Sequence, residues 1–153
     1  MSEALTLPGV ETGIWQVRSK QDRAALAIFD RHYSCQTHPP GEVGPPGRKI
    51  VLVSPCERGL WCSHWPKAEL TLDKLDAYRC SVYHASTARL ASEEIVEAMD
   101  ITLRFWPPPP RDGWVTWVDT RKVASAHPGY CFKKAGWWLD REWSHRYLIR
   151  LRA

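Results

Sequence analysis

Residues 114–138, WVTWVDTRKVASAHPGYCFKKAGWW, contain a strand, a short helix and a second strand in close succession, and this pattern decides the fold. Residues 114–118 (WVTWV) are apolar on both faces of an extended chain, which is typical of a strand inside a sheet covered on both sides. Pro128 suits the first turn of a helix, where an N–H has no intrahelical partner, and Gly136 is typical of a helix end. A strand at residues 137–139 follows.

The chain before residue 114 alternates between strand-like and helix-like spacing of apolar residues. Strands are predicted at residues 14–18, 49–53, 60–65 and 78–84, helices at 21–32 and 92–106, and a last strand at 146–151. Ser92 is predicted as the N-cap of the second helix, and Glu93 and Glu94 suit its positive end. Alternation along residues 78–84 predicts two faces, one with Tyr78, Cys80 and Val82 and the other with Ser81 and Tyr83. The order predicts an α/β fold with a mixed sheet.

The composition is that of one soluble globular domain, residues 1–153, with 44% hydrophobic and 25% charged residues. No apolar run approaches the ~20 residues of a membrane span, and the start lacks the pattern of a secretory signal. Five cysteines, an odd number, favour reduced thiols. A cytoplasmic protein with no membrane segment is therefore expected.

Two stretches interrupt regular structure. Residues 38–48 form a Pro/Gly-rich loop, and residues 107–110 form a polyproline connector. A loop as long as the first is, inside a compact domain, either functional or disordered. The connector follows the second helix and carries the chain to the next strand.

The net charge of +4 is unevenly distributed. From Arg111 onward the chain has nine Lys or Arg residues and four Asp or Glu residues. This surplus favours an anionic partner such as nucleic acid or a phosphate-bearing cofactor, and a solvated basic face is the alternative.

The element order, together with the closing segment 130–137 (YCFKKAGW), resembles the acyl-CoA-dependent N-acetyltransferase superfamily known as GNAT. His32-Tyr33-Ser34, Asp119 and His127-Pro128-Gly129 resemble the Mom-type proteins, bacteriophage enzymes with a GNAT-like fold that modify adenine in DNA. The resemblance implies a mixed, mostly antiparallel central sheet with helices on both faces. It also implies a transferase that acts on a nucleic-acid base inside a bacterial cell.

The loop at residues 85–91 (ASTARLA) departs from this family, because it lacks the glycines that cradle the pyrophosphate of CoA. Glu93 and Glu94 in the next helical turn would repel that group. Ser86, Thr87 and Arg89 remain as predicted donor-binding residues through charge-assisted hydrogen bonds. Acetyl-CoA or another acyl donor is thus implied by the resemblance and disfavoured by the loop.

His32 and Tyr33 are the first candidates for proton transfer, since a histidine titrates near neutral pH and a phenol can donate a proton. A helix-capping histidine beside a packed tyrosine is the alternative. Asp119 is predicted at the carboxyl end of a strand, where open sheets gather ligands, or else in a turn. His127 is predicted either as its partner or as a cap.

The predicted substrate-binding residues are Ser34, Tyr130, Lys133, Trp137 and Trp138. Tryptophans beside basic residues suit stacking against an extruded base, and packing against the sheet is the alternative. Cys35 with His38, and Cys56 with Cys62 and His64, lack paired C-x-x-C spacing, so no metal site is predicted. A base-modifying transferase is the leading hypothesis. The alternatives are an acetyl-CoA-dependent N-acetyltransferase acting on a small molecule or protein amine, and a non-catalytic nucleic-acid-binding module.

Overall fold

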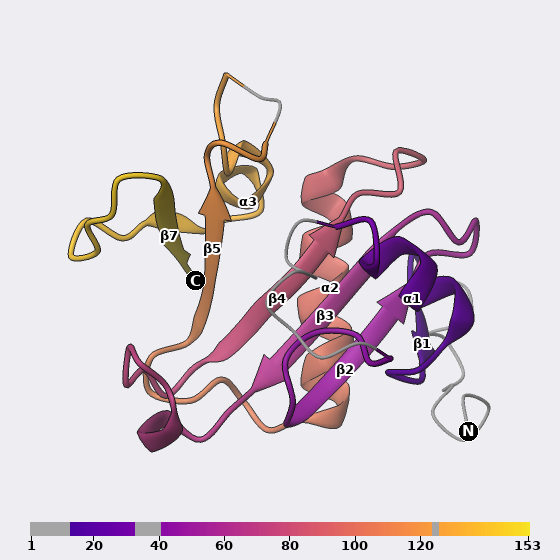
Figure 1. Ribbon diagram of the computed structural model, residues 1–153, viewed down its shortest axis with the longest axis horizontal. Coiled ribbons are helices and arrows are strands. Elements are labelled where there is room, and N and C mark those ends of the chain that lie inside the picture. The colour runs from indigo at the N-terminus through magenta and orange to yellow at the C-terminus, as the bar shows by residue number, and fades with distance from the viewer. Residues whose placement is uncertain (1–12, 33–40, 124–125) are drawn as a thin grey trace.

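The computed structural model describes residues 13–32, 41–123 and 126–153, and a seven-stranded sheet runs through them (Figure 1). In chain order the strands are β1 (Gln16–Arg18), β2 (Arg48–Val53), β3 (Leu60–Trp65), β4 (Tyr78–His84), β5 (Trp114–Asp119), β6 (Trp138–Leu139) and β7 (Leu148–Arg152). Their order across the sheet is β1-β2-β3-β4-β5-β7-β6. Only the β4–β5 pair in this sheet is parallel. The predicted mixed, mostly antiparallel sheet is confirmed.

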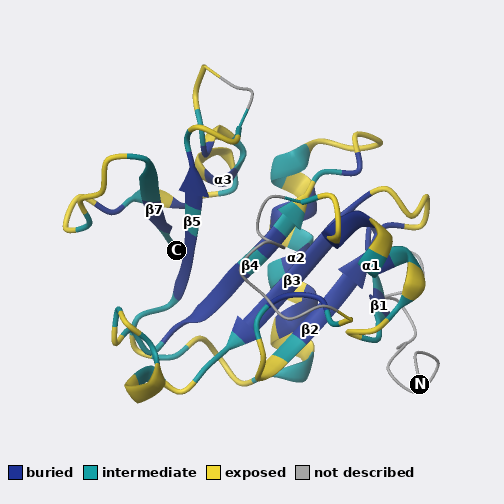
Figure 2. Ribbon diagram, viewed as in Figure 1, coloured by how far each residue is buried: buried dark blue, intermediate teal, exposed yellow. Residues whose placement is uncertain are grey.

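Helices cover both faces of this sheet, as predicted. The long helix α2 (Ala91–Phe105) and the short helix α3 (Tyr130–Lys134) pack on one face through a cluster that includes Ile95, Ile101 and Phe132. Helix α1 (Arg23–Phe29) packs on the other face against alternate residues of β2 and β3. The central strands are consequently the most deeply buried part of the chain (Figure 2).

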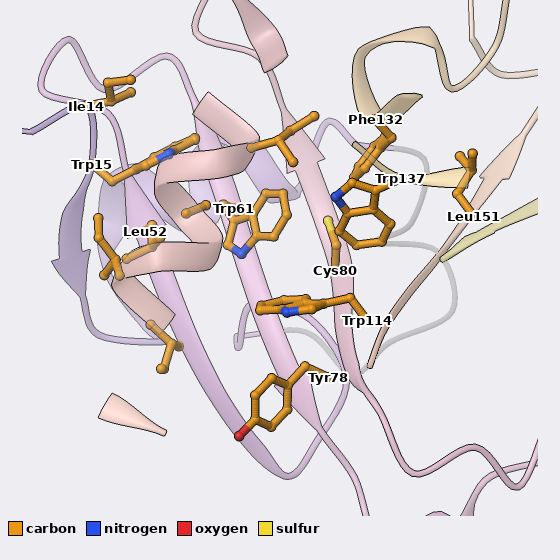
Figure 3. Close-up of a cluster of buried hydrophobic side chains, with 14 of the residues drawn as sticks. Ile14, Trp15, Leu52, Trp61, Tyr78, Cys80, Trp114, Phe132, Trp137 and Leu151 are labelled. Atoms are coloured by element: carbon orange, nitrogen blue, oxygen red, sulfur yellow. The ribbon is translucent and has the colours of Figure 1, made fainter. Parts of the chain in front are cut away.

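Tryptophans fill the core beneath α2. Trp15, Trp61, Trp114 and Trp137 are at most 3% exposed, and the last three lie around one another in the centre of the sheet (Figure 3). Trp61 and Trp114 meet edge to face with ring centroids 6.3 Å apart. Much of the high tryptophan content is therefore packing, which is the commonest use of large aromatic rings.

The parallel strands β4 and β5 pair over only two residues. Tyr78 is opposite Trp114 and Arg79 is opposite Val115, after which the two strands diverge (Figure 1). Beyond the paired part, the Thr116 hydroxyl donates to the backbone oxygen of Cys80 at 2.8 Å. A side chain thereby satisfies a carbonyl that the ladder no longer pairs. The sheet is open between the carboxyl ends of β4 and β5.

The predicted faces of β4 are wrong beyond Cys80. The register with β3 shifts between Cys62 and Ser63, so that Ser81 is the extra residue of a bulge. Because a bulge inserts one residue, it reverses which side chains face which layer. Tyr83 therefore joins Cys80 on the α2 face, and Val82 packs with α1.

The predicted helix ends also differ from the observed ones. Ser92 lies inside α2, which is preceded by Leu90 in an extended conformation without a side-chain cap. Helix α1 begins after Asp22, whose carboxylate accepts from the N–H of Ala25, and it ends earlier than predicted. Helix α3 begins after Gly129, which adopts φ +81°, and not at Pro128 as predicted. The last strand, β7, begins at Leu148, two residues later than predicted. Residue type alone predicts the end of a helix only to within one or two residues. Packing of the folded chain decides at which residue the helix begins.

Gly113 closes the turn into β5, and replacing it with alanine is expected to destabilise the fold. Its φ is +69°, and a Cβ there would lie 2.3 Å from the carbonyl oxygen of Ala153. We expect Gly113→Ala to lose about 3 kcal/mol of unfolding free energy in urea titrations. Gly136→Ala is the matched control, because it also has positive φ but open space around the Cβ, and it should lose only about 1 kcal/mol. Equal losses in the two variants would contradict this role of the close contact.

Candidate functional site

A cavity of about 430 Å³ lies at the open ends of β4 and β5. Its size is within the range of roughly 300–1,000 Å³ that is typical of small-molecule sites. It is lined by Arg31, His32, Tyr83, His84, Ala85, Val118, Lys122, Val123, Gly129, Cys131 and Phe132. Four of these side chains are basic, and no carboxylate occurs among the described lining residues. The cavity therefore suits a flat or apolar group attached to an anion.

His32 enters this cavity from the end of α1. Its backbone N–H donates to the carbonyl oxygen of Phe29, the last residue of α1. Its Nε2 lies 3.2 Å from the carbonyl oxygen of Tyr83. A carbonyl only accepts, so Nε2 donates and the lone pair of the neutral ring is on Nδ1. Burial is the main cause that lowers the pKa of His32 below 6.5, and the nearby His84 lowers it further. His32 is consequently uncharged at neutral pH and able to accept a proton.

Tyr83 and Glu94 form a buried hydrogen-bonded pair at the back of the cavity. The Tyr83 hydroxyl donates to Glu94 Oε1 at 2.9 Å, and Glu94 is fully buried. Burial and this carboxylate raise the pKa of Tyr83 far above its ordinary value of 10.0. Tyr83 therefore stays protonated at physiological pH and acts as a hydrogen-bond donor.

The loop between β4 and α2 is bound to the same glutamate. The backbone N–H of Ser86 donates to Glu94 Oε1 at 3.2 Å, and the Ser86 hydroxyl donates to Oε2. Thr87, in a left-handed conformation, and Arg89 are exposed. A phosphate in this loop would need the donors of Ser86, but these donors already bind the buried Glu94 carboxylate. The same carboxylate would repel a phosphate. The pyrophosphate of CoA does not fit this loop, and we assign no step to CoA.

Asp119 and His127 are placed outside the described lining of the cavity. The Asp119 carboxylate accepts from the backbone N–H, Nε and Nη2 of Arg121, at 3.0, 3.1 and 3.0 Å. Arg121 also holds the pKa of Asp119 below its usual value. His127 is exposed, and its carbonyl accepts from the N–H of Tyr130 in the turn before α3. This geometry agrees with the prediction that Asp119 forms a turn. It gives no support to the prediction that Asp119 and His127 act together on a substrate.

The predicted substrate-binding residues separate into three groups. Trp137 is 3% exposed and packs against Phe132 and Trp114, so it belongs to the core. Tyr130, Lys133 and Trp138 are exposed but lie outside the described cavity lining. Ser34 lies outside the described residues, as do Tyr33, which was predicted as catalytic, and the potential metal ligands Cys35 and His38.

Sequence reasoning missed Tyr83, His84 and Glu94 as parts of the site. Tyr83 and His84 end a strand, which is the position where open sheets bind ligands, and that signal was present in the sequence. Glu94 gave no such signal, because its role depends on contacts with residues eight and eleven positions away.

Within the residues that the structure describes, no group of three or more His, Cys, Asp or Glu side chains could hold a metal ion. None of the described helices has the length and apolar character needed to cross a membrane.

The low pKa of His32 has a measurable consequence for titration and stability. In NMR titrations we expect the His32 ring to show a midpoint below 6.5, and His84→Asn should raise it by removing a neighbouring positive charge. Because the native state then binds fewer protons than the unfolded state, stability should fall as the pH drops below 6.5 toward the His32 pKa. The variant His32→Asn should lose less stability over that interval. A midpoint at or above 6.5 would contradict burial as the dominant influence.

Comparison of the chain with protein-family models, with curated proteins and with solved structures found no match. The interpretation of the site therefore depends on its geometry and on the motifs in the sequence. That geometry is a cavity of about 430 Å³ between diverging strands, with an uncharged histidine at its edge and basic side chains in its walls.

Proposed function

We propose that this protein is a transferase with a GNAT-like fold that modifies a base of DNA. The carrying observation is the cavity between β4 and β5, whose described lining contains Arg31, Lys122, His32 and His84 and no carboxylate. A nucleotide joins an anionic phosphate to a flat ring, which matches the basic and apolar parts of these walls. The resemblance of residues 32–34 and 127–129 to Mom-type proteins favours DNA as the source of that nucleotide.

The apolar part of the cavity would receive a base taken out of the DNA stack. Phe132, Val118 and Val123 line it, and enzymes that act on a base commonly hold the extruded ring between such side chains. Arg31 and Lys122 would bind the phosphates that flank this nucleotide, since both are cationic and exposed at the cavity. Binding would thus combine a positioned ring with a neutralised backbone.

His32 would accept the proton that an exocyclic amine of the base loses as its nitrogen bonds to the transferred group. In the same reaction the bond between that group and its activated donor breaks, and the departing part of the donor keeps the electron pair. The neutral imidazole is the competent form, and burial favours it. The hydrogen bond from Nε2 to the Tyr83 carbonyl fixes the ring orientation and the tautomer of the neutral ring. Glu94, through Tyr83 and Ser86, holds the strand end that carries this carbonyl.

The alternative of an ordinary acetyl-CoA-dependent enzyme is less well supported, because Glu94 takes the donors of the loop that would hold the pyrophosphate. Calorimetry distinguishes it, since tight binding of CoA without DNA affinity would favour that class. A non-catalytic nucleic-acid-binding module would bind DNA but leave its nucleosides unchanged.

The test of base modification uses cells that express the protein. Host DNA is digested to nucleosides, and mass spectrometry searches for a nucleoside of new mass. We expect His32→Asn to lower the yield of that nucleoside roughly 100-fold or more, because a proton acceptor contributes that much to such steps. Arg23→Asn is the control, since Arg23 is exposed on the same helix outside the described lining of the cavity, and it should leave the yield unchanged.

An unchanged nucleoside profile with folded wild-type protein would overturn the proposed function. A modified nucleoside made equally well by His32→Asn would retain the activity but remove His32 from the mechanism. Circular dichroism of the purified variants separates both outcomes from failure to fold.

A further inference from the structure

Two loops far apart in the sequence meet beside the cavity. The backbone N–H and the hydroxyl of Thr120, just after β5, both donate to the carbonyl oxygen of Tyr147, at 2.8 and 2.9 Å. Tyr147 belongs to the connection between β6 and β7. Lys122, two residues after Thr120, also lines the cavity. We call the surface formed by Arg121, Lys122, Arg146 and Tyr147 the basic ridge, and it adjoins the cavity through Lys122.

Two guanidinium groups of the basic ridge converge on one ring. Arg121 lies 4.1 Å and Arg146 lies 5.1 Å from the centre of the Tyr147 ring. Cations over an aromatic face are attracted by the ring, but two cations near one ring also repel each other. Asp119 already balances the charge of Arg121, so Arg146 is the guanidinium at this ring whose charge an added anion would balance.

Two carboxylates on these loops, Asp119 and Asp140, are already engaged in ion pairs. Asp119 pairs with Arg121 at 3.0 Å, and Asp140 pairs with Arg150 at 2.7 Å and with Arg152 at 3.3 Å. In the part of the chain that the structure describes, neither Lys122 nor Arg146 forms an ion pair with a carboxylate. Both side chains are exposed, so their charges are available to a partner from solution.

Aromatic rings continue the basic ridge along the same connection. Trp143 and His145 stack with their planes 13° apart and their centroids 6.3 Å apart, and the Trp143 indole N–H donates to the Leu148 carbonyl at 3.1 Å. A surface on which cations alternate with aromatic rings is typical of proteins that bind a nucleic-acid strand. Phosphates pair with the cations, and bases stack on the rings.

We propose that the basic ridge binds the sugar–phosphate backbone of a DNA strand and leads that strand to the cavity between β4 and β5. The choice of DNA as the strand rests on the proposed function. The surface itself follows from two exposed cations, Lys122 and Arg146, that form no ion pair within the described residues, and from the place of Lys122 in the cavity lining. An acidic protein segment is the competing partner, and the test includes it.

The test measures binding of the full chain to a fluorescent single-stranded DNA of 20 or so nucleotides by anisotropy over a series of salt concentrations. We expect Arg146→Glu to weaken binding about tenfold at ~0.1 M salt and to reduce the slope of log affinity against log salt by about 1, as one lost phosphate contact would. Arg121→Gln tests the second guanidinium and should act in the same direction. Lys67→Glu is the control, because it makes the same charge change on an exposed residue just after β3, near the start of β4 and opposite the end that lines the cavity.

Each outcome decides one point. Equal loss in Arg146→Glu and Lys67→Glu, or no loss in Arg146→Glu, would overturn the basic ridge as the binding surface. Displacement of the DNA by a polyglutamate peptide at equal charge concentration would replace DNA with an acidic protein partner. Thermal melts of each variant exclude loss of fold as the cause.

The nucleoside analysis separates this inference from the proposed function. A wild-type protein that modifies DNA while Arg146→Glu binds and modifies it normally would refute the basic ridge alone. Ridge-dependent DNA binding without any new nucleoside would refute base modification alone.

Discussion

The short parallel ladder between β4 and β5 is the constraint on which the candidate site depends. Only Tyr78 with Trp114 and Arg79 with Val115 are paired, and the Thr116 hydroxyl then bonds the Cys80 carbonyl where the ladder ends. A sheet that stays paired has no interior opening, because its side chains fill both faces. The divergence instead brings α1, the end of β4 and α3 around one cavity. The tryptophan core beneath α2 holds the two halves of the sheet at the paired end.

A buried carboxylate gives the β4–α2 loop its chemistry. Glu94 accepts hydrogen bonds from Tyr83 and from two donors of Ser86, which satisfies a charged group that would otherwise be very unfavourable in the core. The same bonds fix the end of β4 that positions His32 through the Tyr83 carbonyl. The resemblance noted in the sequence implies that this loop binds an external anion, but its donors instead bind the side chain of Glu94. This substitution agrees with the absence of glycine from residues 85–91.

Local patterns predicted the element types well and the details near the site poorly. All seven strands and the three α-helices occur close to their predicted positions, because alternation and helical spacing are properties of neighbouring residues. The faces of β4 were wrong because the bulge at Ser81 depends on pairing with β3, which no local pattern reveals. Ser92 was predicted as a cap because its residue type suits one, but the chain enters α2 earlier. His32 was found from its residue type and its place at a helix end, whereas Tyr83 and Glu94 required the tertiary contacts.

The sequence by itself determined the order of strands and helices, a strand at residues 114–118 that is apolar on both faces, and the basic surplus after Arg111. The tertiary structure decided which of these residues meet. Trp137 and Trp138 are adjacent and chemically identical, yet one is in the core and the other is 55% exposed on the edge strand. Thr120 and Tyr147 are distant in sequence, yet their hydrogen bonds assemble the basic ridge. Periodicity is encoded within a few residues, while burial and contact depend on which segments pack together, and only the folded chain brings those segments into contact.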